Sequence, residues 1–563
     1  MFLHKLSVIA ALVMLCASGT PANAATPSQV GFLVVAPDRG FLGNQEVRTL
    51  VEEFKKSYPA ALGLVGRDYT GVDGEYAVYL SRAAQELKQA GATDILVIPL
   101  FLSDADPLLT RIKPLVPAYT GGLPVRWAPA MAHDYLIGQI VLDRVEALSE
   151  QATAERLILV GTGAMDEASA IALKADVDKL LGYVKRYKEF RDTETVIYYD
   201  RAADNAEQKN RDIKSRLLAQ IAKQGRTLLV PVSIGPKFDT AMSLTSWLGG
   251  QFKQTQVVYK PNELLPHPNV LLWLKKTANR ETPLSAASLG VVIMPHGSTQ
   301  PWNDAVESAI QPLMSQYPVE MAYGMGDPHI IQDAVSRLEQ RGIRRIVFVR
   351  MYALDHHMKS LTDYILGLAE DVPGSDHGGG HDHATEAPPQ VRTAALFSTF
   401  GGYEQNPAIA QVLHKRIAEM STDPANETVL LIAHGEGTDE GNDKWLAVMS
   451  QNIDRLRQDP HCAKLKAVKA LTVREDWPKE REQAVAAVRA AIEAGGENGR
   501  VLVIANRLYG SGPYKTMLKG LTYEMNEKGL VDPVLTRWLE DGVRRLTAEL
   551  IPHDTEQRRM AQP

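Results

Sequence analysis

Two histidine positions in the middle of the chain have a residue type and a placement suited to metal or proton chemistry. His296 follows the apolar run at 290–294. His357, with His356 beside it, follows a second apolar run at 346–349, about 60 residues further on. A neutral imidazole binds divalent transition metals and accepts protons near pH 7. If the two runs are neighbouring strands, these histidines can share one site.

The elements that would position these histidines are strands of a parallel sheet. Short β-branched runs are typical of strands that are buried on both faces. In parallel α/β sheets ligands bind just past the carboxyl ends of the strands, where both histidine positions fall. Between the two runs we expect a helix, a short strand at 319–323 and a second helix. Asp327 can cap this helix, Pro328 suits its first turn, and Gly342 ends it.

This order of strands and histidines resembles the class II tetrapyrrole chelatases, the sirohydrochlorin cobaltochelatases and ferrochelatases of cobalamin and sirohaem synthesis. The resemblance implies that His296 matches the first family histidine, and that His357, or His356 after a one-residue shift, matches the second. It also implies insertion of a divalent metal into a tetrapyrrole. The family often has a glutamate after the middle strand, where this chain has Met325.

An internal repeat extends the resemblance to most of the chain. Residues 262–274 parallel 526–539, and residues 125–149 parallel 391–421, with an offset near 260 residues. Each copy is itself doubled. We therefore expect an α/β protein of four chelatase-like, flavodoxin-type units, each a parallel sheet with flanking helices, paired into two bilobal halves. Internal pairing of this kind predicts a monomer. The expected boundaries are a signal peptide at 1–24, units at 30–150, 151–283, 284–372 and 391–552, and a linker at 373–390.

The fourth unit supplies two further candidate residues. His434 follows the apolar run at 429–433 and repeats the strand-His-Gly pattern. Glu475 stands where the resemblance places a functional carboxylate, but in the other lobe. These two residues either join the histidines of the third unit or line an opposite wall. The structural alternatives are a satisfied structural histidine and an ion pair from Glu475 to Arg474 or Arg481.

A histidine-rich segment lies in the linker after the third unit. His377, His381 and His383 stand among glycines and two aspartates, and a Pro-Pro pair follows. Histidine and aspartate together bind Co²⁺, Ni²⁺, Zn²⁺ or Fe²⁺. Metal capture is the favoured interpretation, and a solvated polar linker is the alternative.

The first two units keep the strand pattern but lack the paired histidines. Asp38 stands at the place of His296, and glycine replaces histidine in the second unit. The favoured interpretation is a scaffold. The alternative is ligand binding without chemistry, in which Asp38 offers a hard-oxygen metal ligand.

Composition and the first residues indicate the class of protein and its compartment. The chain is 45% hydrophobic and 23% charged, with a net charge of −6, which gives no reason to expect nucleic acid as a partner. Residues 1–24 combine a basic start, an apolar stretch and an Ala-Asn-Ala site, so we expect a cleaved signal peptide and a periplasmic protein. Cleavage leaves only Cys462, so no intramolecular disulfide can form. No later stretch predicts a membrane span.

Two functions from different classes follow from these observations. The favoured one is a lyase that inserts Co²⁺ or Fe²⁺, with Ni²⁺ as an alternative, into a sirohydrochlorin-type tetrapyrrole. His296 would be metal ligand and proton acceptor, His357 its partner, and His356 the alternative partner. Glu475 and His434 would complete the polar wall. No organic cofactor is expected, because the metal is the substrate. The alternative is a non-catalytic periplasmic protein that binds metal or tetrapyrrole on a chelatase scaffold.

Overall fold

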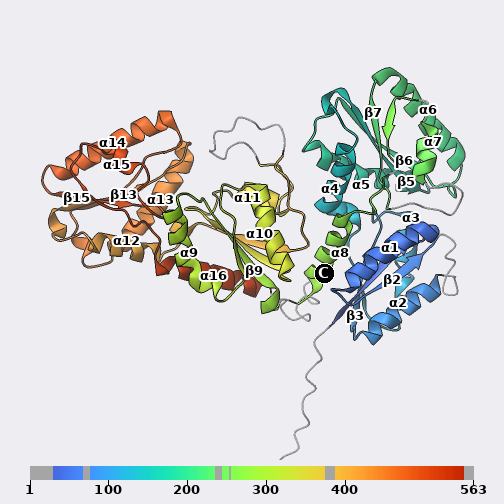
Figure 1. Cartoon of the computed structure of the whole chain (residues 1–563), viewed down its shortest axis with the longest axis horizontal. Helices are drawn as coiled ribbons and strands as arrows, with labels where there is room; N and C mark the ends of the chain where they lie inside the picture. Colours follow the sequence, from blue (N-terminus) through green and yellow to red (C-terminus); the bar gives the residue numbers. More distant parts are fainter. Residues whose placement is uncertain are drawn as a thin grey trace, which may run out of the picture.

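The computed structural model describes residues 29–66, 76–234, 244–252, 255–260, 262–283, 285–373 and 387–550. Within these ranges the chain forms four four-stranded sheets with flanking helices (Figure 1). Neighbouring strands pair in parallel in all four sheets. In each sheet the first strand lies between the second and third, and the fourth strand pairs with the third. The predicted α/β architecture of four similar units is therefore confirmed.

The strands follow the same order in every unit. In the first half they are β1 (Val30–Pro37), β2 (Ala60–Val65), β3 (Asp94–Pro99) and β4 (Val125–Trp127), then β5 (Arg156–Ala164), β6 (Asp192–Tyr199), β7 (Thr227–Pro231) and β8 (Val257–Tyr259). In the second half they are β9 (Leu289–Pro295), β10 (Val319–Met321), β11 (Arg345–Met351) and β12 (Leu396–Phe400), then β13 (Glu427–Ala433), β14 (Ala467–Thr472), β15 (Arg500–Ala505) and β16 (Glu524–Asn526).

Helices connect these strands and cover both faces of the sheets. Those of the first half are α1 (Gly40–Lys55), α2 (Ala77–Gln89), α3 (Pro107–Ile112), α4 (Tyr135–Glu146), α5 (Glu167–Lys185), α6 (Ala206–Gln224), α7 (Leu244–Gln251) and α8 (Pro268–Glu281). Those of the second half are α9 (Gln300–Met314), α10 (Pro328–Gln340), α11 (Lys359–Ile365), α12 (Ile409–Ala418), α13 (Asp439–Leu456), α14 (Pro478–Gly496), α15 (Tyr514–Met517) and α16 (Pro533–Leu550).

The third sheet places the two histidine positions at one edge. Every residue of β9 and β11 is buried, as their continuous apolar sequences predict. The two strands pair in register up to Met351 opposite Pro295, so their carboxyl ends stop together. His296 and the loop that carries His356 and His357 consequently start from adjacent positions.

The units are paired because helices cross from one unit to the other. One hydrophobic core includes buried residues of the first and second units, and another includes those of the third and fourth. In the first half α4 packs on α5, and α8 packs on α1 and α4. In the second half α12 packs on α13, and α16, drawn in red, lies along α9 and contacts β11 (Figure 1). Each half is therefore one bilobal body with a shared core.

The segment before β12 joins the two halves. The Tyr135 hydroxyl donates to the Val391 carbonyl oxygen at 2.9 Å, and Arg392 forms two hydrogen bonds of 2.6 Å with Asp143. The same segment leads into β12, which pairs with β11. The third sheet therefore takes its last strand from residues beyond the predicted start of the fourth unit at 391.

None of the helices in the described ranges is long and apolar enough to cross a bilayer.

Candidate functional site

The loop after β11 carries two adjacent histidines, and a buried arginine holds it in place. Arg350, near the end of β11, is 1% exposed. Its Nη2 donates to the Asp355 carboxylate at 2.9 Å and to the Asp355 carbonyl oxygen at 3.2 Å. His356 is exposed and His357 is half-buried. Met358 ends the loop with a φ of +59° and leads into α11.

Glu436 lies in the loop after β13, the first strand of the fourth unit, two residues after His434. Gly435, with a φ of +83°, turns the chain at the end of β13. The Arg474 Nε donates to the Glu436 carbonyl oxygen at 2.6 Å, which fixes the loop. A methyl group at Gly441 would lie 1.9 Å from the Glu436 Oε2, so glycine at this position in α13 makes room for the carboxylate. The Glu436 side chain is thereby directed towards the third unit.

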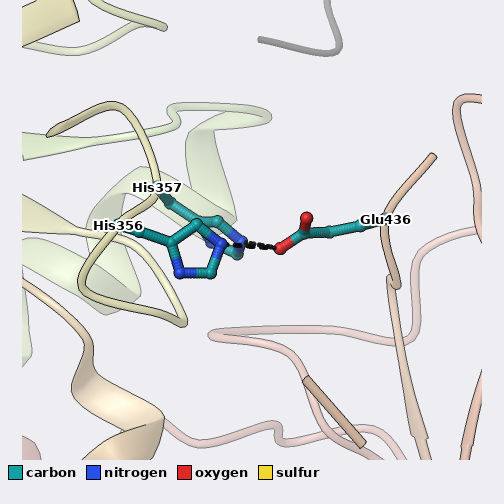
Figure 2. Close-up of side chains that lie close together, drawn as sticks. All are labelled: His356, His357 and Glu436. Atoms are coloured by element: carbon teal, nitrogen blue, oxygen red, sulfur yellow. Dashed lines mark hydrogen bonds and ion pairs between the residues drawn. The ribbon is translucent and has the colours of Figure 1, made fainter. Parts of the chain in front are cut away.

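His356, His357 and Glu436 meet across the boundary between the two units (Figure 2). Their ligand atoms all lie within 4.8 Å of one another. The Glu436 Oε1 is 3.0 Å from the His356 Nε2 and 2.6 Å from the His357 Nε2. Two imidazoles and one carboxylate form a ligand set that divalent transition metals use, with bonds of about 2.0 to 2.2 Å for Zn²⁺. Small movements of these side chains would bring all three into bonding distance of one ion.

The protonation of the cluster suits a metal ligand. Burial lowers the pKa of His357, although the Glu436 carboxylate opposes this. The Leu354 N–H faces the His357 Nδ1 at 3.4 Å, so the proton of the neutral ring belongs on Nε2, facing Glu436. Burial tends to raise the pKa of Glu436, but hydrogen bonds from His357 and His356 outweigh it and lower that pKa. A neutral imidazole next to an ionised carboxylate is the arrangement from which a metal can displace a proton.

Trp445 of α13 separates His357 from His434. Its ring centroid lies 5.0 Å from that of His357 in an edge-on contact, and 6.1 Å from that of His434 in a stacked contact. Its indole Nε1 donates to the buried Glu404 Oε2 at 3.0 Å, and the Asn506 amide donates to the same oxygen at 2.7 Å. Burial raises the pKa of Glu404 to about 7. These contacts fix the indole and therefore one wall of the cluster.

His434 is placed for a different task from His357. Its Nδ1 lies 2.8 Å from the Gly435 carbonyl oxygen, and its Nε2 lies 3.1 Å from the Asp476 carboxylate. Burial lowers the pKa of His434, but the hydrogen bond to Asp476, the charges of Glu475 and Asp476 and the Gly435 carbonyl oxygen together raise it above its ordinary value. With both nitrogens facing acceptor oxygens, the protonated ring is favoured relative to an ordinary histidine. It could bind a metal only after losing a proton and leaving Asp476.

Glu475 and His296 lie outside the ligand cluster. The Glu475 carboxylate forms an ion pair with Arg507, whose guanidinium lies over the Tyr514 ring. Of the two arginines named in the structural alternative, Arg481 donates to the Glu475 carbonyl oxygen and not to its carboxylate. His296 is exposed, and its Nδ1 lies 2.6 Å from the Gly297 carbonyl oxygen.

His296 nevertheless acts electrostatically on the fourth unit. Its charge is one of the influences that lower the pKa of Asp476, after the hydrogen bond from His434. Asp476 therefore links the first predicted histidine of the third unit electrostatically to His434. The roles predicted for His296, Glu475 and His434 stay predictions.

Further predicted positions are the linker histidines, Met325 and Asp38. His377, His381 and His383 lie outside the described residues. Met325 is 47% exposed. In the first unit the Asp38 carboxylate accepts hydrogen bonds from Asn44 at 2.7 Å and from the Tyr76 hydroxyl at 2.9 Å, and is held in a polar network.

The sequence interpretation missed Glu436, Asp476 and Trp445. Glu436 had a usable signal, because it lies two residues after His434 at the carboxyl end of a buried strand. Asp476 likewise follows Glu475 directly. Trp445 had no such signal, because its contact with His357 depends on how the two units are packed.

Comparisons with known proteins give a distant likeness among solved structures. No protein-family model matches the chain, and no curated protein matches it at a significant level. Among solved structures the chain is similar to DR2241 from Deinococcus radiodurans, described as a multi-domain protein with structural similarity to chelatases and two additional novel domains. The sequence identity is 15% and the TM-score is 0.31. The match covers 48% of this chain and 56% of DR2241, so the chain matches little more than half the length of that protein.

Proposed function

We propose that the second half of the chain is a chelatase that binds a divalent metal, Co²⁺ or Fe²⁺, and inserts it into a sirohydrochlorin-type tetrapyrrole. The observation that carries the proposal is the convergence of His356, His357 and Glu436 from two units at the carboxyl ends of their strands. The sequence resemblance to class II chelatases supports the reaction. Export through a signal peptide would place this activity in the periplasm.

The residues would divide the work as follows. The imidazoles of His356 and His357 and the Glu436 carboxylate would hold the metal ion before transfer. Insertion releases two protons from pyrrole nitrogens, and these protons need acceptors near the macrocycle. His296 is exposed at the neighbouring strand end, and an imidazole is suited to taking up protons near neutral pH. Asp476, which faces both His296 and His434, would stabilise the resulting cation.

The proposal is tested by mixing the purified full chain with sirohydrochlorin and Co²⁺ and following the absorbance spectrum. We expect metal insertion faster than in the protein-free mixture, with more than one product formed per chain. The Glu436→Ala variant should lose the acceleration, and Glu440→Ala, which changes an exposed glutamate of α13, should keep it. A wild-type rate equal to the protein-free rate would exclude a chelatase.

The second candidate is a non-catalytic protein that binds metal or tetrapyrrole in the same place. Two observations favour it. The Glu475 carboxylate forms an ion pair with Arg507, and Met325 stands where the family often has a glutamate. Neither position therefore offers a free carboxylate. Loss of a reacting group would abolish turnover and leave binding largely intact. In the same assay, tight binding at one ligand per chain without acceleration would support this candidate.

A further inference from the structure

A polar cavity is lined in part by Asp355 of the histidine loop. It has a volume of about 620 Å³ and opens where β11 and β12 end. Arg350, Lys359 and Arg545 supply its positive charges, Asp355 is the one carboxylate in its lining, and Trp538 forms an apolar wall. Cavities of this size hold organic ligands. Asp355 lines this cavity, and the next residue, His356, contacts Glu436. One loop therefore contributes both to the cavity and to the cluster of His356, His357 and Glu436.

Arg350 is the most informative group in the cavity. Its Nη1 donates to the Thr399 Oγ1 at 2.8 Å and its Nη2 to the Asp355 Oδ1 at 2.9 Å. Its buried Nε has no hydrogen-bond partner among the residues that the structure describes. A buried guanidinium that leaves a donor unused is costly, because the desolvation of that N–H is not compensated. An acceptor oxygen from a ligand would supply the missing partner.

Two glycines keep the cavity open beside this guanidinium. A methyl group at Gly401 would lie 3.0 Å from the Arg350 carbonyl oxygen and 3.4 Å from its Nε. Gly402 has a φ of +78°, and a methyl group there would lie 2.7 Å from the Asp355 nitrogen. Larger residues at either position would press on Arg350 or on the histidine loop. The Gly-Gly turn after β12 thus leaves room for a ligand next to Arg350.

The charge balance of the cavity favours an anion. Lys359 forms an ion pair with Asp363, which also lies 3.9 Å from the Arg350 Nη1. Arg545 is exposed, and the structure shows no acidic partner for it within the described ranges. Three cations therefore face Asp355 and the more distant Asp363. Arg in particular binds carboxylates through paired hydrogen bonds.

We propose that this cavity binds a small organic anion through its carboxylate groups, with Arg350 and Arg545 as binding residues. The site is separate from the metal cluster and goes beyond metal insertion. A ligand carboxylate on Arg350 competes with Asp355, which is the group that ties the histidine loop to β11. Occupancy of the cavity is thereby coupled to the position of His356.

The test uses the full chain, freed of metal on a chelating resin, and isothermal titration calorimetry with citrate as the probe. Inorganic phosphate is titrated in parallel at the same ionic strength. We expect citrate to bind at one site per chain, more tightly than phosphate. The Arg545→Gln variant should weaken citrate binding at least about five-fold, the effect of losing one charge-assisted contact. The matched control is Arg337→Gln, a half-exposed arginine of α10 that pairs with Glu320 outside the cavity.

Further variants keep the outcome interpretable. Arg350→Lys keeps the positive charge but removes the planar guanidinium that forms paired hydrogen bonds, so it should weaken citrate binding. Because Arg350 is buried, this substitution also puts folding at risk. Arg545→Gln is at the surface and avoids that risk. No citrate binding, tighter binding of phosphate than citrate, or equal losses in Arg337→Gln and Arg545→Gln would each overturn the proposal.

Discussion

The His357 Nε2 lies 2.6 Å from the Glu436 Oε1, although the two residues belong to different units of the second half. Neither unit alone contains this ligand set. The contact depends on the shared core of the third and fourth units, which fixes their strand ends relative to each other. Metal binding should therefore report on the packing of the two units as well as on the ligands themselves.

Replacing Glu436 with glutamine tests the cluster as a metal site. The amide loses the negative charge that favours a divalent ion, so we expect the affinity for Co²⁺ or Zn²⁺ to fall at least about ten-fold, the loss that even an outer partner of a ligand typically causes. Competition titration against a coloured chelator measures this. Glu440→Gln is the control, and an unchanged affinity in Glu436→Gln would remove this residue from the site.

His357 should remain neutral at a lower pH than an ordinary histidine. Burial lowers its pKa from the ordinary 6.5, so the folded state binds this proton less tightly than the unfolded state. Its contribution to stability is complete above about pH 6.5 and is lost as the pH falls through the lowered pKa. NMR titration of the ring signals should give a midpoint below about 6.5. A midpoint above that value would contradict the assignment of His357 as a neutral ligand.

Replacing Asp476 with asparagine should lower the pKa of His434. The hydrogen bond to the Asp476 carboxylate is the main influence that raises that pKa against burial. The stability that the His434 cation contributes is present below about pH 6.5 and is lost as the pH rises through its raised pKa, so Asp476→Asn should flatten this dependence. NMR titration of both proteins checks the shift. Asp439→Asn is the control, because Asp439 pairs with Arg474 and not with a histidine.

Glu404 should make the fold less stable as the pH rises. Burial raises its pKa from 4.5 to about 7, so the folded state holds this proton more tightly than the unfolded state. The contribution is complete below about pH 4.5 and is lost as the pH rises through about 7. Glu404→Gln keeps an oxygen for Trp445 and Asn506 and should flatten urea-unfolding midpoints measured from about pH 5 to about pH 8. An equal pH slope in wild type and variant would contradict this.

Replacing His296 with alanine should separate metal binding from metal insertion. His296 is exposed and lies outside the cluster of His356, His357 and Glu436, so the variant should fold and bind Co²⁺ normally. If His296 takes up pyrrole protons, turnover with sirohydrochlorin should fall about 100-fold or more, the usual contribution of a positioned base. Unchanged turnover would assign proton uptake to another group, and lost Co²⁺ affinity would make His296 a ligand.

The sequence predicted the elements that carry the site better than the contacts within it. The apolar runs that became β9, β11 and β13 were recognisable because parallel strands are buried on both faces. The position of His356 and His357 after β11 could therefore be predicted from the sequence. The position of Glu436 just after β13 could also be predicted, but its pairing with these histidines could not, because the neighbour of a carboxylate in a turn depends on how the two units dock.

The case of Glu475 shows the same limit. Nearby arginines in the sequence suggested its ion-pair partner, but the side chain of Arg474 is bound to the Glu436 carbonyl oxygen and to Asp439. The actual partner, Arg507, comes from the end of β15. Spatial proximity at the carboxyl edge of the sheet prevailed over proximity along the chain.

The crossing of α16 has a consequence for how the second half folds during synthesis. This helix packs on α9 and contacts β11, but it is translated after all the strands of the fourth unit. While the chain is being synthesised, an apolar face of the third unit would be exposed, because α16 has not yet left the ribosome. This face includes Ile310 and Leu313 of α9. The two units should therefore mature together, and the growing chain would need protection from aggregation until residues 533–550 emerge.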